Sequence, residues 1–409
     1  MRIVVVGGGL GGLAAAVAAH RAGHEVTVLE GSPAPRETGA GIGIMPNGVL
    51  ALDSLGFGAQ VRALAAPLDA GGGLRDRHGR PLLAADQAAV QKRTGAPLAV
   101  VARPWLHHLL AEALPAGALR TGAPVTGVRP AGDGVEIETG TGTGETGGPA
   151  GSARIRADVV VAADGARSRI RAALFPDHPG LAGSGEFAAR ALAPAAPPGV
   201  DLVAGELLDH RTGERFGCLP MAGPADGGAV YWYAAWRRDA PGDPVARHRW
   251  LRDRHADWHP CAAALVDATP AESVHVVETA QLARPLPALA VGRVALLGDA
   301  AHAMTPDLGQ GACQAFEDAA VLGTVLTGAG PRDVVAALRD YDARRRPRTT
   351  ALMQQARRMN RLLGLSGPRA RVRDALMRAV PQAMATRALV AQFRFDAAVT
   401  DTGPVRAGM

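Results

Sequence analysis

The first twelve residues, MRIVVVGGGLGG, constrain the fold of this chain more than any other segment. Residues 2–6 are apolar and β-branched, which predicts a strand that is covered on both faces. Gly7, Gly9 and Gly12 then match the pattern G-x-G-x-x-G, and an Ala-rich helix pattern continues through residues 13–22. The first glycine permits a tight turn, the second lets a pyrophosphate approach the backbone, and the third lets the helix pack closely on the strand. This arrangement directs the helix N-terminus at a phosphate.

A carboxylate after the next predicted strand completes the motif. Residues 25–29 (EVTVL) form that strand, and Glu30 follows it, eighteen residues after Gly12. An acid at about this spacing binds the ribose hydroxyls of a dinucleotide. A glycine-rich turn without a ligand would leave Glu30 unexplained, so we predict a dinucleotide site.

Composition limits the class of protein. A chain of 409 residues is too long for one ordinary core, so we expect two interlocked domains. Its hydrophobic content of 47% is enough to form large cores. The formal net charge is +6, but Lys92 is the single lysine and the arginines are spread along the chain. This pattern argues against nucleic-acid binding.

The cysteines and the apolar segments indicate the cellular compartment in which the protein is expected. Cys218, Cys261 and Cys313 are far apart and form no C-x-x-C pair, which argues against a redox-active disulfide and against a metal site. Reduced thiols, together with a first strand that begins at residue 2, predict a cytoplasmic protein without a signal peptide. No apolar run reaches the roughly 18 residues of a membrane span.

Two further segments predict buried strands that end on a glycine or an acid. Residues 158–163 (DVVVAA) precede Asp164–Gly165, and residues 293–297 (RVALL) precede Gly298–Asp299. The carboxyl ends of parallel strands meet at one edge of a sheet, where ligands bind. The sequence therefore predicts an α/β fold in which these motifs and Gly7 surround one cofactor.

Other segments indicate how a second domain is interleaved with the first. Short alternating strands such as AVYWYAAW in residues 183–290 predict an antiparallel sheet that forms a substrate domain. Residues 312–328 and 331–362 predict long helices, and the Arg-rich residues from about 366 predict an amphipathic helical region. We therefore expect a discontinuous cofactor domain (1–70, 98–182 and 291–365), a substrate domain (71–97 and 183–290) and a C-terminal helical region (366–409).

The segment 292–319, GRVALLGDAAHAMTPDLGQGACQAFEDA, carries the strongest chemical signal. Asp299 follows the strand, and then Pro306, Gly309 and Gly311 lead into a helix that begins near Gly311. A helix N-terminus presents free N–H groups and the positive end of a dipole. These donors would stabilise the negative charge of a reduced flavin.

Together these motifs resemble a known family. The G-x-G-x-x-G start, Arg103, Asp164–Gly165 and residues 298–311 (GDAAHAMTPDLGQG) occur in the same order in the single-component FAD-dependent aromatic hydroxylases, which have the para-hydroxybenzoate hydroxylase fold. The resemblance covers nearly the whole chain and is strongest to the urate, salicylate and hydroxybenzoate hydroxylases. It implies a Rossmann-like FAD-binding domain, an interleaved antiparallel-sheet substrate domain and C-terminal helices.

The resemblance also implies contacts to a non-covalently bound FAD. Gly11–Gly12 would lie by the pyrophosphate, while Glu30 would hold the adenosine ribose with Arg36 nearby. Pro306 and residues Gly309–Ala312 would line the flavin ring. The full set implied to bind the cofactor is Gly7, Gly9, Gly11, Gly12, Glu30, Gly31, Arg36, Gly43, Arg103, Val125, Asp164, Gly165, Asp299, Pro306, Gly309, Gln310, Gly311 and Ala312.

Within that set, Arg103 would contact the diphosphate and ribityl region, Val125 the adenine through its backbone, and Asp299 a ribityl hydroxyl. Asp164–Gly165 resembles a motif that serves both FAD and NADPH.

Three other positions have two interpretations. Cys313 replaces an Asn that is common in relatives, and it is either a buried structural thiol or a reactive one. His302 has a packing or backbone role in the family, with an acid–base role as the alternative. Residues 344–348 (RRRPR) predict a solvated helix face, or else a docking surface.

Substrate contacts are implied at two predicted strands. Arg215, in ERFGCLP, matches an arginine that contacts substrate in the urate hydroxylase, and Tyr231 or Tyr233 matches an active-site aromatic. The same segments are also consistent with paired strands whose aromatic residues pack the sheet. We predict Arg215, Tyr231 and Pro306 as the catalytic set.

The implied activity is that of an NAD(P)H- and O₂-dependent monooxygenase, monomeric or homodimeric, acting on an aromatic or heteroaromatic small molecule. NAD(P)H reduces FAD, O₂ adds at the flavin C4a to give a hydroperoxide, and its terminal oxygen is transferred to the ring. A dehydrogenase or oxidase that removes hydride from its substrate is the alternative. A flavin halogenase is disfavoured because W-x-W-x-I-P and an active-site lysine are missing. A non-enzymatic FAD-binding module would not need the substrate domain.

Overall fold

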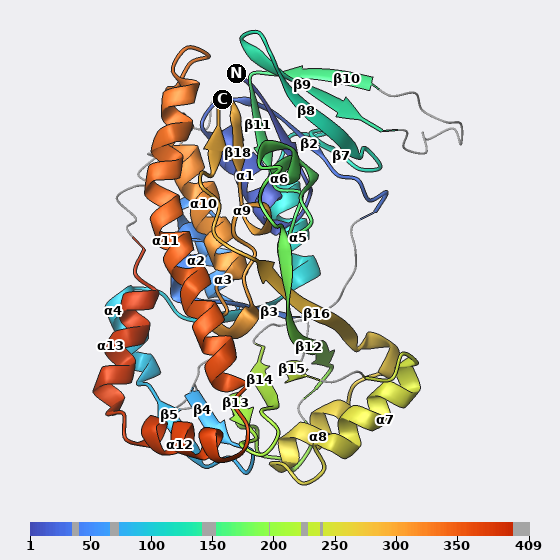
Figure 1. Cartoon of the computed structure of the whole chain (residues 1–409), viewed down its shortest axis with the longest axis vertical. Coiled ribbons are helices and arrows are strands. Elements are labelled where there is room, and N and C mark those ends of the chain that lie inside the picture. The colour runs from blue at the N-terminus through green and yellow to red at the C-terminus, as the bar shows by residue number, and fades with distance from the viewer. Residues whose placement is uncertain are drawn as a thin grey trace.

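The computed structural model describes residues 1–34, 41–65, 73–140, 153–195, 197–221, 228–237 and 240–395. Its two large sheets lie towards opposite ends of the molecule, and α11 (Val334–Leu363) runs along both (Figure 1). As expected, this is a mixed α/β architecture with a parallel sheet and a second, largely antiparallel one.

The first sheet has six strands in the order β17-β18-β11-β1-β2-β7. Neighbouring strands are parallel except for β17, which is antiparallel to β18. The central strands are Val/Ile-rich and buried on both faces, as parallel strands are. Their bounds are β1 Arg2–Val6, β2 Glu25–Leu29, β7 Leu119–Arg120, β11 Val159–Ala162, β17 Ala290–Val291 and β18 Val294–Leu296.

The register of this sheet confirms that three motifs meet at one edge. Val6 pairs with Ala162, and Ala162 pairs with Leu296, so β1, β11 and β18 end level with one another. The glycine turn at Gly7, the Asp164–Gly165 pair and the Gly298–Asp299 pair therefore emerge side by side.

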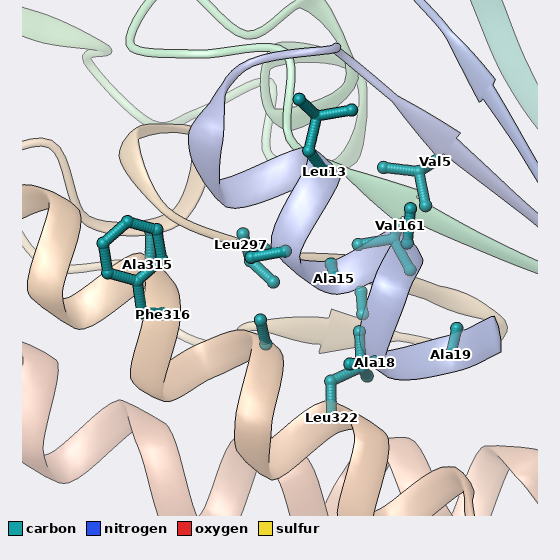
Figure 2. Close-up of a cluster of buried hydrophobic side chains, with 14 of the residues drawn as sticks. Val5, Leu13, Ala15, Ala18, Ala19, Val161, Leu297, Ala315, Phe316 and Leu322 are labelled. Atoms are coloured by element: carbon teal, nitrogen blue, oxygen red, sulfur yellow. The ribbon is translucent and has the colours of Figure 1, made fainter. Parts of the chain in front are cut away.

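Helix α1 (Leu10–Arg21) is covered on all sides because its side chains are small. Its alanines pack on the strands on one side and on α10 (Gly311–Leu326) on the other (Figure 2). A Cβ at Gly323 of α10 would come 3.0 Å from the Cβ of Ala18. This close approach of two helices fixes α10 against the glycine turn.

The second sheet has seven strands in the order β16-β12-β15-β14-β13-β4-β5. All neighbouring strands are antiparallel except β13 and β4. Its strands are β4 Gly73–Asp76, β5 Pro81–Ala84, β12 Leu181–Ala193, β13 Gly205–Leu208, β14 Arg215–Pro220, β15 Val230–Trp236 and β16 His275–Leu282.

Two helices that the sequence did not predict cover one face of this sheet, α7 (Pro244–Arg254) and α8 (Pro260–Asp267). Their apolar residues form a core with Phe216 and Trp232, whose stacked rings lie 5.5 Å apart. The predicted antiparallel sheet in residues 183–290 is confirmed, but the sequence interpretation did not include these two helices. Asp243 caps α7 by accepting a hydrogen bond from the N–H of Ala246, and proline follows it, which is a helix-start signal in the sequence.

The remaining elements lie outside the two large sheets. Residues 312–328, 331–362 and the region after 366 were predicted as helices, and the structure confirms them as α10, α11 and the pair α12 and α13. The other elements are α2 Pro46–Ser54, α3 Gly58–Arg62, α4 Gln87–Thr94, α5 Arg103–Glu112, α6 Arg169–Leu174, α9 Asp299–His302, α12 Gly367–Arg378, α13 Gln382–Gln392, η1 Ala271–Ser273, η2 Pro306–Leu308, the pair β3 Gly41–Ile44 and β6 Ala99–Ala102, and the three-stranded sheet of β8 Val125–Ala131, β9 Gly134–Thr139 and β10 Ala153–Ala157.

Strand membership follows the predicted interleaving in part. β4 and β5, within residues 71–97, belong to the seven-stranded sheet, whereas β12 begins at Leu181, before the boundary at 183. The division into domains as such stays a prediction.

Candidate active site

The turn after β1 leaves open space in front of α1. Gly7 has φ +109°, and a Cβ there would overlap the carbonyl oxygen of Ala163. A Cβ at Gly12 would overlap the carbonyl oxygen of Gly7. Gly9, by contrast, is the N-cap of α1, and no atom of the described residues lies within 4 Å of its Cβ position. The free N–H groups of α1 thus face a space that a phosphate can enter.

Gly11 is turned away from that space. A Cβ there would lie 2.9 Å from the Cβ of Ala315 and 3.0 Å from Cδ2 of Leu297. Its missing side chain lets α1 approach α10 and β18. Contact between Gly11 and the pyrophosphate stays a prediction that depends on its backbone alone.

Glu30 lies at the end of β2 with both oxygens directed at the backbone. One oxygen accepts a hydrogen bond from the N–H of Gly8 and the other from the N–H of Ser32, each at 2.7 Å. A carboxylate oxygen has two lone pairs, so each retains capacity for a ribose hydroxyl. Gly31 follows this site, and its Cβ position would lie 3.5 Å from the Cβ of Pro124.

A charged cluster surrounds Asp299 at the ends of β11 and β18. Burial, and then the positive charge of Arg190, lower the pKa of Arg103, while Asp299 opposes them. Burial also lowers the pKa of Arg171, whose guanidinium donates to the carbonyl oxygen of Ala300 at 3.1 Å. The negative charge of Asp299 thus opposes the effect of burial on the pKa of both arginines.

Asp164 has an unpaired acceptor at this edge. Its Oδ2 accepts hydrogen bonds from the N–H groups of Arg169 and Ile170 at the start of α6. Its Oδ1 is buried and has no partner in the described part of the chain. An unsatisfied buried carboxylate oxygen is costly, and the hydroxyl or amide of a bound ligand would satisfy it.

The loop from Pro306 to Gly311 leads into an uncapped helix, as the sequence predicted. The side chain of Gln310 is directed inward, and its Oε1 accepts a hydrogen bond from Asn47 Nδ2 at 2.8 Å. No side chain in the described part of the chain caps α10, so its first N–H groups remain available. A Cβ at Gly311 would lie 4.0 Å from Oδ1 of Asp299, which places the helix N-terminus beside the charged cluster.

A buried polar network of residues from α9, α10 and α11 lies behind the Pro306–Gly311 loop. Arg345 Nε donates to Asp318 Oδ1 at 2.7 Å, and its Nη1 donates to Glu317 Oε2 at 2.6 Å. Asp318 Oδ2 lies 2.6 Å from His302 Nε2. Burial acts to raise the pKa of Asp318, but His302 and Arg345 outweigh it and hold that pKa at about 2.

Burial in this network bears on the sequence interpretations of two residues, Arg345 and His302. Arg345 is 2% exposed, so the prediction of a solvated helix face was wrong for this residue. Helix α11 passes directly behind α10, and its register turns Arg345 inward while Arg344 stays in solvent. His302 is buried against Asp318, in agreement with its packing interpretation.

Cys313 is a buried thiol in the first turn of α10. Its Sγ accepts a hydrogen bond from the N–H of Met45 at 3.3 Å. Burial raises its pKa to about 12, so the thiol stays protonated near neutral pH. This supports the structural interpretation of Cys313.

Arg215 lies on the face of the seven-stranded sheet that is directed at this loop. Its guanidinium is 3% exposed and contacts Glu186 Oε2 at 2.6 Å, Asp307 Oδ1 at 2.8 Å and Glu206 Oε1 at 3.2 Å. Asp307 directly follows Pro306, so this ion pair joins the loop to the seven-stranded sheet. Contact between Arg215 and a substrate stays a prediction.

Tyr231 and Tyr233 lie on the same sheet face, with ring centroids 6.1 Å apart. A Cβ at Gly41 of β3 would lie 2.8 Å from the Cβ of Tyr231, so β3 packs directly on this ring. Gly43 of β3 has only Leu219 and Met45 near its Cβ position, both at 3.9 Å. Strand β3 therefore borders the aromatic face, and Met45, which follows it, would meet a Cβ at Gly309 of the loop.

Three positions complete the comparison with the sequence predictions. Val125 begins β8 and pairs with Thr139, away from the seven-stranded sheet. Arg36 lies outside the described residues. His107, which was not predicted, has Nε2 2.8 Å from the carbonyl oxygen of Gly8. Its spacing of i+4 from Arg103 on α5 was the available signal.

The residues present fit FAD. Along the sheet edge, in the strand order β2-β1-β11-β18, the structure places the carboxylate of Glu30, the open position at Gly9, the Asp164 oxygen that has no described partner, and the uncapped α10. These features supply sites for hydroxyls, a phosphate and a flavin ring. No group of three or more His, Cys, Asp or Glu side chains among the described residues is arranged to hold a metal ion.

Comparison with known proteins agrees with this geometry. Residues 1–356 match a family model described as an FAD binding domain. The chain is 35% identical over 382 residues to 3-amino-4-hydroxybenzoate 2-monooxygenase of Streptomyces platensis, covering 92% of both. It is 30% identical over 371 residues to FAD-dependent urate hydroxylase of Klebsiella pneumoniae, covering 88% of this chain and 89% of the relative. The structure of Klebsiella pneumoniae HpxO complexed with FAD and uric acid superimposes with a TM-score of 0.81 at 27% identity, covering 96% of each chain.

The chain belongs to the FAD-binding domain family and has the fold of its aromatic hydroxylases. It is an FAD-dependent monooxygenase of that class, as the motifs in its sequence implied. No helix in the described ranges is long and apolar enough to cross a membrane.

Proposed function

We propose that this enzyme uses NAD(P)H and O₂ to hydroxylate an aromatic or heteroaromatic small molecule held between the Pro306–Gly311 loop and the seven-stranded sheet. The observation that carries the proposal is the buried contact of Asp307 with Arg215 at 2.8 Å. It joins the loop suited to a flavin ring to a sheet face that carries Tyr231 and Tyr233. A planar substrate is therefore expected to lie against both.

Bound FAD would supply the redox chemistry, and the protein would bind, orient and exclude water. Gly9 and the N-terminus of α1 would hold the pyrophosphate, Glu30 the ribose, and Arg103 with Asp299 the diphosphate and ribityl chain. The uncapped α10 would stabilise negative charge on the ring system without reorganisation.

On the face of the seven-stranded sheet, the buried ring of Tyr231 would form one wall of the substrate site. It belongs to an apolar cluster that includes Val100 of β6, Leu192 of β12 and Leu219 of β14. Such a wall orients a ring and keeps water from the reacting atoms. Pro306 would contribute the opposite wall beside the flavin.

The test is NADH and NADPH oxidation by purified, FAD-loaded enzyme with and without phenols, salicylates, aminohydroxybenzoates, hydroxyquinolines and purines, followed by product analysis under ¹⁸O₂. One compound class should accelerate oxidation and acquire one labelled oxygen. Purified protein without flavin, or product without label, would refute the proposal. Bleaching of the flavin by a compound alone would favour the dehydrogenase or oxidase.

Three finer assignments belong to the same proposal. We expect NAD(P)H to act as a transient co-substrate, with Asp164–Gly165 near its path. The buried free cysteines fit a reducing, cytoplasmic location. We expect a monomer or homodimer, which light scattering of the purified protein would distinguish.

A further inference from the structure

The outer face of α12 is apolar, although this helix lies at the surface. Leu376 and Val372, one helical turn apart, are 66% and 60% exposed, the highest values among the large apolar side chains of the described ranges. Ala375 and Ala379 are exposed beside them. A surface helix normally carries polar residues on its outer face. The face of α12 therefore suits a partner that removes apolar side chains from water.

The inner face of α12 is packed, so its outer face is held in place. Met377 belongs to a buried cluster with Leu82 of β5 and Leu208 of β13. Arg373 pairs with Asp374 at 2.7 Å and donates through Nη1 to a carbonyl oxygen at the end of α11, also at 2.7 Å. These contacts fix α12 to the seven-stranded sheet and to α11 at the lower end of the molecule (Figure 1).

The C-terminal helices also hold the excess positive charge of the chain. Residues 349–395 contain nine arginines and a single acid, the buried Asp374. Arginines occur throughout the chain, but elsewhere acids balance them: the rest of the sequence contains 35 basic and 37 acidic residues. This part of the surface is therefore strongly cationic, whereas the remainder is close to neutral.

Three exposed arginines flank the apolar face of α12. Arg369 and Arg371 precede it, and Arg378 follows it. Arg378 has Asp76 Oδ2 of β4 at 3.7 Å, while neither Arg369 nor Arg371 forms an ion pair with another described residue. The face thus combines apolar side chains with cations that are available to an anionic partner.

The neighbouring helix ends have the same character. Leu362, near the end of α11, is 39% exposed and follows the exposed Arg361. Met384, in the first turn of α13, is 55% exposed, and Arg387 is exposed one turn later. We refer to the exposed side chains of residues 361–387 as the C-terminal basic face.

The composition of the C-terminal basic face favours a membrane surface over other partners. An anionic bilayer attracts arginines and accepts apolar side chains among its headgroups. A second copy of this chain would bring like charges together. Protein interfaces depend on large aromatic anchors, but residues 361–387 contain no Trp, Tyr or Phe. The phosphates of a nucleic acid would pair with the arginines and leave Val372 and Leu376 without an apolar contact.

We propose that the C-terminal basic face docks this enzyme on an anionic membrane surface. Val372 and Leu376 insert among the headgroups, and the arginines around them extend to the lipid phosphates while their aliphatic stems stay against apolar surface. The protein lies on the bilayer and does not span it. The inference is independent of the proposed hydroxylation, because none of these side chains belongs to the candidate active site.

The experiment measures binding of the full-length, FAD-loaded enzyme to sedimented vesicles. The vesicles consist of phosphatidylcholine alone or with about one-third phosphatidylglycerol, at salt concentrations of about 0.05 and 0.5 M. The variants are R369Q/R371Q and V372S/L376S. The matched control is V245S/R249Q, which changes an exposed valine and an exposed arginine one turn apart on α7. FAD absorbance and thermal unfolding report the folding of each variant.

The wild type should bind the vesicles that contain phosphatidylglycerol at least about 25-fold more tightly than phosphatidylcholine alone, since each unpaired arginine contributes about 5-fold. R369Q/R371Q should lose about 25-fold in partition coefficient on the anionic vesicles. V372S/L376S should lose at least about 4-fold, the contribution of one buried methylene. High salt should weaken wild-type binding because it screens the charges, and V245S/R249Q should bind like the wild type.

Three results would overturn the proposal: equal wild-type binding to both kinds of vesicle, unchanged binding in either α12 variant, or an equal loss in the α7 control. Polyglutamate and RNA serve as competing probes, and tighter binding to either than to the anionic vesicles would assign the face to an acidic protein or a nucleic acid instead. Self-association that V372S/L376S abolishes, without vesicle binding, would assign it to a second copy of the chain.

Discussion

Replacing Arg345 with Met removes the cation that two buried carboxylates share behind the cofactor loop. Its guanidinium contacts Asp318 at 2.7 Å and Glu317 at 2.6 Å, and all three side chains are sealed from water. Met has a similar length and is apolar, so the substitution leaves no large cavity. The loss of charge is therefore the main perturbation.

The expected cost follows from this burial. Removing one partner of a buried ion pair destabilises a protein by about 3–5 kcal/mol, because a charge remains without compensation. Arg348 also contacts Glu317, at 2.7 Å, and offsets part of that loss. We therefore expect Arg345→Met to lower the free energy of unfolding by about 3 kcal/mol at pH 7.

The effect should depend on pH with a definite sign. In the wild type, the pKa of Asp318 lies at about 2, below its unfolded value, so the stability it contributes is present at neutral pH and is lost only as pH falls towards 2. Without Arg345, burial raises the pKa of this carboxyl. As pH falls, protonation of Asp318 removes its uncompensated charge in the variant. The difference in the free energy of unfolding between variant and wild type should therefore shrink from pH 7 to pH 4.

The assay is urea unfolding followed by tryptophan fluorescence at pH 7, 5.5 and 4. Arg344→Met is the matched control, since Arg344 precedes Arg345 on α11 and forms an exposed i,i+4 pair with Asp340. That pair should contribute at most about 0.5 kcal/mol. Equal stabilities of the two variants at pH 7, or a difference that grows on acidification, would refute the reasoning.

Three further predictions concern the turn, the second core and the buried thiol. The new Cβ of Gly12→Ala would overlap the carbonyl oxygen of Gly7, so this variant should give a lower folded yield. The new Cβ of Gly9→Ala meets no described atom within 4 Å, so thermal unfolding should show an apo-protein as stable as the wild type. Its Kd for FAD should nevertheless rise at least about 10-fold. Burial lowers the pKa of His255 in the folded protein to about 4, whereas the unfolded chain takes up a proton from about pH 6.5 downward. The free energy of unfolding should therefore fall by roughly 3 kcal/mol between neutral pH and pH 4. His255→Gln should flatten this part of the stability–pH curve. Cys313, with a pKa raised to about 12, should resist iodoacetamide at pH 8 in native protein and react once urea unfolds it, as mass spectrometry would show.

The sequence predicted those parts of the fold that depend on local constraints. The Val-rich strands, the G-x-G-x-x-G turn and the uncapped start of α10 are each specified within a few residues, by side-chain shape, by the steric demands at glycine and by helix-end chemistry. Parallel strands place their carboxyl ends at one edge, so three distant motifs could be brought together without coordinates. The helices α7 and α8 were missed because the aromatic strands around them dominated the pattern.

The sequence by itself thus determined that this chain builds a dinucleotide site from strand ends and glycines, since those residues act through their own backbone conformation. Only the tertiary structure decided which charges are compensated. The sequence predicted Arg215 as a substrate contact and Arg345 as part of a solvated helix face, yet each is surrounded by carboxylates that lie 9 to 92 positions away along the chain. Arg190, which no motif marks, lacks such partners among the described residues. The cause is register: shifting a strand by one residue, or rotating a helix by one position, exchanges a buried side chain for a solvated one.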